Sequence, residues 1–187
     1  MTALIIILAV VIVLAGYVLF LYNALVTRRN RVDEGWSDID VQLKRRHDLI
    51  PNLMESVKGY MAHERETLEA VTAARTAAVN AQASGNTAQL AQAENMLTGA
   101  LKTIFALSEN YPNLRANENF LQLQQELADT ENKIMAARRF YNGQVRDFNT
   151  AVQQFPAVVI ANPLGFKARM FFELDDASER QNPKVAF

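Results

Sequence analysis

The segment from Tyr22 to Tyr60 carries a regular stripe of apolar residues. Taking every third and fourth residue alternately from Val32 gives a seam in which only Arg46 is not apolar: Val32, Trp36, Ile39, Leu43, Arg46, Ile50, Leu53, Val57 and Tyr60. Polar and charged residues occupy most positions between them. Because this spacing covers one face of a helix, the segment predicts a bundle or coiled-coil helix.

An uncharged apolar run, Ala3 to Leu21, comes directly before this helix. At about 1.5 Å per residue, such a run crosses a hydrocarbon layer as a helix. A cleaved signal peptide is the competing interpretation, but the run is too long, no Lys or Arg precedes it and no A-x-A site follows it. The sequence therefore predicts a transmembrane anchor over residues 1–23, with residues 3–22 in the lipid bilayer.

Pro51 interrupts the stripe. It has no N–H to donate to the carbonyl of His47, four residues earlier. Two interpretations are open: one long helix kinks at Pro51, or one helix ends near Asp48 and another begins. In either case the pattern stays helical through Tyr60 to about Ala83.

Two further helices are predicted after the turn Ser84–Asn86, where Gly85 suits a helix end and Asn86 or Thr87 suits the next N-cap. The third helix stops at the segment Asn110–Asn113, which contains Pro112, and the fourth has apolar residues spaced by threes and fours from Phe120 to Phe155. Short connections favour antiparallel neighbours. The sequence thus predicts an all-α fold in which the transmembrane helix continues into an antiparallel up-and-down bundle of four helical segments over residues 24–155.

Residues 156–187 form a tail with a different pattern. Up to Phe172 it is apolar without a helical period, and Pro156, Pro163 and Gly165 interrupt it. We expect an extended segment laid over the bundle and a polar, mobile end; the alternative is an apolar surface that inserts in lipid or a partner. Excess apolar surface usually marks an interface, so we expect a homo-oligomer and take the phenylalanines of this tail as candidate interaction residues: Phe166, Phe171 and Phe172.

Composition excludes several classes of function. The 19 Lys and Arg residues nearly balance 20 Asp and Glu, so the chain has no electrostatic signature of a nucleic-acid binder. There is no Cys, which excludes disulfides, thiolate metal sites and a Cys nucleophile. His63-Glu64 begins an H-E-x-x-H pattern, but Thr67 stands where the second histidine belongs. We expect a non-enzymatic protein with no cofactor; the alternative is a metal-dependent hydrolase that uses His47 and His63 across a subunit boundary.

Arg46 is the unusual member of the apolar seam. A charge in such a position costs several kcal/mol unless it is paired. Glu126, Asp129 and Glu131 of the last helix are candidate partners, and such a pair can set the register between helices. No catalytic or metal-binding residue is predicted, and the candidate structural or interaction residues outside the tail are Trp36, Leu43, Arg46, Pro51, Tyr60 and Tyr141.

Several motifs of the chain resemble the LemA family of bacterial membrane proteins. They are Y-N-x-L-V-x-x-R-N-x-V-D-E-x-W-S-D-I-D-V-Q-L-K-R-R-x-D-L-I-P-N-L from Tyr22, V-K-G-Y-x-x-H-E from Val57, N-Y-P-x-L-x-A-N-x-x-F from Asn110 and R-x-x-Y-N from Arg138. The resemblance implies a membrane-anchored antiparallel helical bundle without an agreed enzymatic activity. For some members it also implies an association with membrane-embedded zinc metalloproteases and envelope stress. We therefore expect a single-pass scaffold or adaptor that self-associates or holds a membrane partner.

The charge distribution predicts which side of the membrane holds the bundle. Arg28, Arg29 and Arg31 follow the apolar run closely, and positive residues near a span resist translocation. We expect a protein of the cell inner or plasma membrane with a cytoplasmic bundle and an outside N-terminus. A Ser84→Cys variant tests this, because its thiol is unique in the chain: a membrane-impermeant maleimide should label it only after lysis of spheroplasts. Labelling in intact spheroplasts would place the bundle outside.

Overall fold

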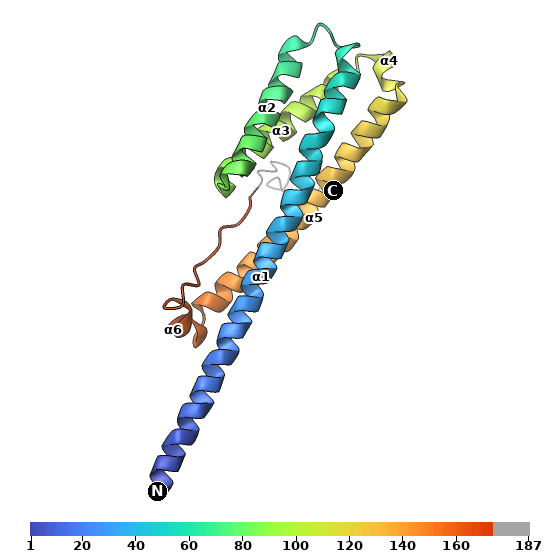
Figure 1. Ribbon diagram of the computed structural model, residues 1–187. Coiled ribbons are helices and arrows are strands. Elements are labelled where there is room, and N and C mark those ends of the chain that lie inside the picture. Colours follow the sequence, from blue (N-terminus) through green and yellow to red (C-terminus); the bar gives the residue numbers. More distant parts are fainter. Residues whose placement is uncertain (174–187) are drawn as a thin grey trace, which may run out of the picture. The chain divides into compact units, whose positions relative to one another are not determined.

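The computed structural model describes residues 1–173, which contain helices and no strand (Figure 1). The helices are α1 (Thr2–Lys58), α2 (Arg65–Ser84), α3 (Thr87–Ser108), α4 (Pro112–Arg115), α5 (Glu118–Gln153) and α6 (Ala157–Ala161). The predicted all-α class, with an apolar N-terminal helix that continues into the bundle, is confirmed. The tail begins with the short helix α6, which its sequence did not predict, and its polar end lies outside the described residues.

Helix α1 passes through Pro51 without ending. The carbonyl of His47, which Pro51 leaves without its usual donor, accepts a hydrogen bond of 2.8 Å from the Arg75 Nε of α2. The helix ends instead at Lys58, before Gly59, so the prediction of helix through Tyr60 was wrong. Glycine has a low helix propensity, and the turn after it carries Met61 into the core, where its side chain is fully buried.

The turn between α2 and α3 has the predicted chemistry. Gly85 adopts a left-handed conformation with φ of 68°, and its N–H donates to the carbonyl of Gln82. The side chain of Asn86 accepts hydrogen bonds from the N–H groups of Ala88 and Gln89. These bonds satisfy the first free donors of α3, so a two-residue connection is enough to reverse the chain.

The described chain falls into two compact units. One unit comprises Asp40–Met135 with Phe172 and Glu173, and contains α2, α3 and α4. Apolar side chains from α1, α2, α3, α4, α5 and the turn after α1 fill its core: Ile50, Leu53, Val57, Met61, Val71, Ala78, Ala93, Leu97, Leu101, Ile104, Leu114, Phe120 and Leu127. The periodic stripes of the long helices therefore bury one another, as their spacing predicts.

The other unit comprises Met1–Ile39 and Ala136–Phe171. In it the first part of α1 packs against the last part of α5. A Cβ added to Gly35 would lie 3.2 Å from the Cα of Tyr141 and from a ring carbon of Phe140, so the two helices approach closely at this glycine. The Trp36 and Tyr141 rings pack beside it, with centroids 5.4 Å apart. The division predicted from the sequence, 1–23, 24–155 and 156–187, stays a prediction.

Truncation of the seam tests the assigned core face. Leu43 is fully buried and Trp36 is partly buried, so we expect Leu43→Ala and Trp36→Ala each to lower the free energy of unfolding by about 2–5 kcal/mol, with Trp36 at the lower end. Val41→Ala is the matched control, because Val41 lies on the same helix with its side chain 60% exposed. Chemical denaturation measures the effect. Midpoints of both variants equal to that of Val41→Ala would show that the face is wrongly assigned.

Candidate functional site

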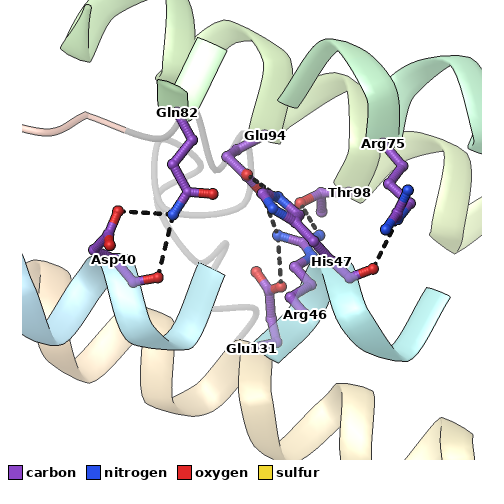
Figure 2. Close-up of polar contacts among 8 residues, drawn as sticks. All are labelled: Asp40, Arg46, His47, Arg75, Gln82, Glu94, Thr98 and Glu131. Atoms are coloured by element: carbon purple, nitrogen blue, oxygen red, sulfur yellow. Dashed lines mark hydrogen bonds and ion pairs between the residues drawn. The ribbon is translucent and has the colours of Figure 1, made fainter. Parts of the chain in front are cut away.

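Charged side chains meet inside the unit that contains α2 and α3 (Figure 2). The Arg46 Nη1 of α1 lies 3.3 Å from the Glu94 Oε2 of α3 and 3.2 Å from the Glu131 Oε2 of α5. Arg46 Nη2 also donates to the Thr98 hydroxyl at 2.6 Å. Glu94 is fully buried, whereas the side chain of Glu131 is 35% exposed. Arg46 therefore ties three helices together through charge-assisted bonds.

His47 belongs to the same cluster. Its Nε2 lies 2.7 Å from Glu94 Oε1, and its side chain is 3% exposed. The guanidinium of Arg46 is always charged and matches an ionised Glu94 carboxylate, which only accepts hydrogen bonds, so the ring N–H of His47 is the donor. Both oxygens of Glu94 are thus used. The cluster satisfies its own charges and presents neither a free base nor an open metal position among the side chains described.

Of the three candidate partners predicted for Arg46, the structure brings one into contact with it. Glu131 is in contact with it. Asp129 instead bonds Lys133 at 2.8 Å, and this hydrogen bond, with the charge of Lys133, lowers the pKa of Asp129. Glu126 accepts a hydrogen bond from Gln122 one turn earlier.

Sequence reasoning missed Glu94, the most buried member of the cluster. The signal was available, because Glu94 lies four residues after Leu90 and three before Leu97 and therefore within the apolar face of α3. A charged residue in the apolar stripe of one helix is costly to bury unless an opposite charge on another helix pairs with it. Arg46 and Glu94 satisfy this rule for each other.

Aromatic side chains of the predicted set gather in the other unit. Phe166 is buried, with ring centroids 5.8 Å from Tyr22 and 6.5 Å from Phe148, and the Arg29 guanidinium lies 5.6 Å from its centroid. The Tyr141 hydroxyl donates to the carbonyl of Met170 at 2.9 Å. Burial raises the pKa of the Tyr141 phenol, and the charge of Arg169 partly opposes this shift.

Residues after Phe166 are fastened to α1 and α5. The Asn149 side chain accepts from the N–H of Arg169 at 2.8 Å and donates to its carbonyl at 2.9 Å. The Arg169 guanidinium lies 3.0 Å from Asp33 Oδ1. The tail is therefore a packed part of this unit up to Met170, and nothing in its apolar pattern indicated these polar attachments.

Four candidate residues remain: Pro51, Tyr60, Phe171 and Phe172. Pro51 is exposed, and Phe171 is 43% exposed. The Tyr60 hydroxyl accepts from the Asn117 side chain at 3.3 Å. Phe172 is fully buried. None of these positions carries a group that the geometry prepares for chemistry.

An open groove lies between α1 and α2 in the unit that contains α3. Its volume is about 820 Å³. Met54 and Leu68 contribute its larger apolar side chains, the small side chains of Ala73 and Ala77 leave space between them, and Lys58 and Glu69 supply charges. The alanine-rich sequence of α2 indicated close packing of helices; at this face it instead leaves a hollow.

Known proteins similar to this chain include members of the LemA family. The model of the LemA family matches residues 35–187. Protein LemA of Metamycoplasma hominis is 30% identical over 168 residues, which cover 86% of this chain and 75% of that protein. The chain belongs to the LemA family. The resemblance seen in the sequence is thereby confirmed.

Two further relatives carry the name of magnetosome proteins. MamQ of Magnetospirillum gryphiswaldense and MamQ 2 of Paramagnetospirillum magneticum are each 23% identical over 181 residues, covering 84% of this chain and 66% of each relative. Within residues 1–173, α1 is the helix long and apolar enough to cross a membrane. Together with the LemA relationship, this helix fits a membrane protein.

The charge cluster generates a stability prediction. Glu94→Gln removes the buried negative charge beside Arg46, and we expect the free energy of unfolding to fall by about 3–5 kcal/mol, because the buried guanidinium then keeps only the partly exposed Glu131 as counter-ion. The matched control is Glu131→Gln, at the partly exposed partner, for which we expect a loss of no more than about 1 kcal/mol. Urea denaturation of both variants measures the difference. Equal losses would mean that Glu94 is not the principal counter-ion.

Proposed function

We propose that this LemA protein is a non-enzymatic, single-pass membrane scaffold or adaptor that associates with other copies of itself or with a membrane partner. The observation that carries the proposal is the groove between α1 and α2, which offers an apolar surface on the helical bundle. Apolar surface of this kind is typical of binding faces. We place the bundle in the cytoplasm, beneath the inner or plasma membrane that α1 spans.

The metal-dependent hydrolase is not favoured. His47 is buried and bonded to Glu94, which is itself held by Arg46. A metal ion bound to His47 would have to break these bonds. The Glu94 carboxylate and the Arg46 guanidinium would then lose their partners in the core, at a cost of several kcal/mol. His63 is exposed in the turn before α2. The two histidines thus occupy unlike environments, and only one is accessible to a second subunit.

The partner class is open to experiment. The family resemblance suggests a membrane-embedded metalloprotease, and the apolar groove fits a helix of such a protein or of a second copy equally well. Deleting residues 156–187 is a poor test of association, because Phe166 and Phe172 in this tail are buried and their loss would disturb the fold. A substitution within the groove leaves these contacts intact.

A charge placed in the groove tests the proposal. Ala73 is exposed and lines the groove, whereas Ala70 is an exposed alanine of the same helix outside the lining. Ala73→Glu should abolish association and Ala70→Glu should preserve it, because a carboxylate resists burial in an apolar interface. Mass photometry of full-length protein in native nanodiscs counts the copies, and crosslinking in native membranes identifies bound partners.

Two results would contradict the proposal. One is a full-length protein that stays monomeric and forms no crosslinked complex at native expression. The other is stoichiometric zinc or iron in purified protein that is lost in both His47→Ala and His63→Ala.

A further inference from the structure

The end of α5 lies beside the last turns of the apolar run of α1. Both belong to one unit, and two contacts show that α5 runs antiparallel to α1. Gly35 lies against Tyr141, and the Arg28 side chain donates to the Asp147 carbonyl at 3.3 Å. The two helices rise by the same distance per residue, so these two contacts fix which residues lie side by side. Gln153 at the end of α5 is therefore level with about residues 22–23 of α1.

Two observations support this level independently of the register. The Tyr22 ring packs on Phe166, the residue that follows the α6 turn. Every side chain from residue 1 to residue 20 is exposed, whereas Leu21, the last residue of the apolar run, is partly covered. Figure 1 shows the N-terminal stretch of α1 extending well beyond α6. The packed part of the unit therefore begins where the predicted membrane span ends.

The segment at this level is apolar and exposed. Phe155 follows α5 with 83% of its surface exposed, Val159 on α6 is 63% exposed, and Leu164 after α6 is 51% exposed. We call these three residues the α6 tip. No charged residue occurs between Asp147 and Lys167. The exposure of three large apolar side chains in one short uncharged segment costs free energy in water. Contact with an apolar boundary would lower this free energy.

Basic side chains border the α6 tip. Arg29 lies over the Phe166 ring, Lys167 is the next residue, and Arg28 bonds the backbone of α5. All three are exposed. Apolar residues beside a basic border match the boundary between the acyl chains and the headgroups of a membrane that contains anionic lipid.

We propose that the α6 tip is a second membrane contact, which inserts in the bilayer that α1 spans. The inference rests on the membrane anchoring of the proposed function and adds a surface to it. The bilayer is the occupant because the tip is continuous with the predicted span: it lies level with the last apolar residues of α1, where lipid is the neighbouring medium. Phe155, Val159 and Leu164 then lie at a depth of about 5–10 Å at the boundary of headgroups and acyl chains.

Depth measurement on the full-length protein tests this contact. The chain has no Cys, so Phe155→Cys, Val159→Cys and Leu164→Cys each provide one thiol for an environment-sensitive NBD fluorophore. The protein is placed as single copies in nanodiscs of phosphatidylcholine and phosphatidylglycerol. Labels at the tip should emit at shorter wavelength than in water, lose intensity to nitroxide-bearing lipids and resist quenching by iodide.

Two control positions interpret the result. Asp38→Cys is exposed on α1 of the same unit, about 25 Å beyond Leu21 by helix rise, and its label should be quenched by iodide only. Val11→Cys lies within the apolar run and should be quenched by nitroxide lipids if α1 is inserted. A Val11 label in water would refute the anchor itself, and with it the proposed function.

With the Val11 label in lipid, tip labels that behave like the Asp38 label would overturn the second contact. Tip labels shielded from iodide but not quenched by nitroxide lipids would also overturn it, because protein rather than lipid would then cover them. Quenching of at least two tip labels by nitroxide lipids, with the Asp38 label unaffected, would establish the contact. The fluorescence of Trp36, the only tryptophan, checks that each variant is folded.

Discussion

A guanidinium buried among helices needs opposite charge within reach, and Arg46 finds it on two other helices of its unit. Its two carboxylate partners come from α3 and α5, and a third polar partner, Thr98, comes from α3. A slip of one helical turn along α1 moves the guanidinium by about 5.4 Å, which breaks every one of these bonds. Leucine and isoleucine seams tolerate such slips because one apolar side chain substitutes for another. The charge cluster therefore specifies which of several similar packings is adopted.

Much of the fold was readable because its signals are local. The apolar seam around Leu43, the cap at Asn86 and the end of α5 before Pro156 each depend on residues within one or two turns. At Pro51 the sequence left a kinked helix and a break both open, because Pro51 is a strong local break signal whose effect on α1 is cancelled from elsewhere. Arg75, more than twenty residues later, supplies the donor that the His47 carbonyl lacks. A non-local hydrogen bond of this kind leaves no trace in the spacing around Pro51.

The site was predicted in part for the same reason. Arg46 was recognisable as a charge within an apolar stripe, and Glu131 was among the partners considered. Glu94 obeys the same rule on α3 and was findable by it. The bonds of Arg169 to Asn149 and Asp33 could not be predicted in this way. Exposed polar residues occur in every bundle, and only the fold decides which of them meet. The groove also escaped prediction, since small residues mark both tight packing and empty space.

Residues 22–34 of α1 join the apolar run to Gly35 as continuous helix, so they hold the close contact at Gly35 at a fixed distance from that run. One inserted residue would raise the contact with Tyr141 by about 1.5 Å and rotate it by roughly 100° about the helix axis, so the glycine would no longer face α5. Substitutions on the outer surface of this stretch leave that geometry unchanged, whereas insertions and deletions do not. The length of this stretch therefore sets how far the contact at Gly35 lies from the apolar run, whereas the two ends of a flexible linker have no fixed separation.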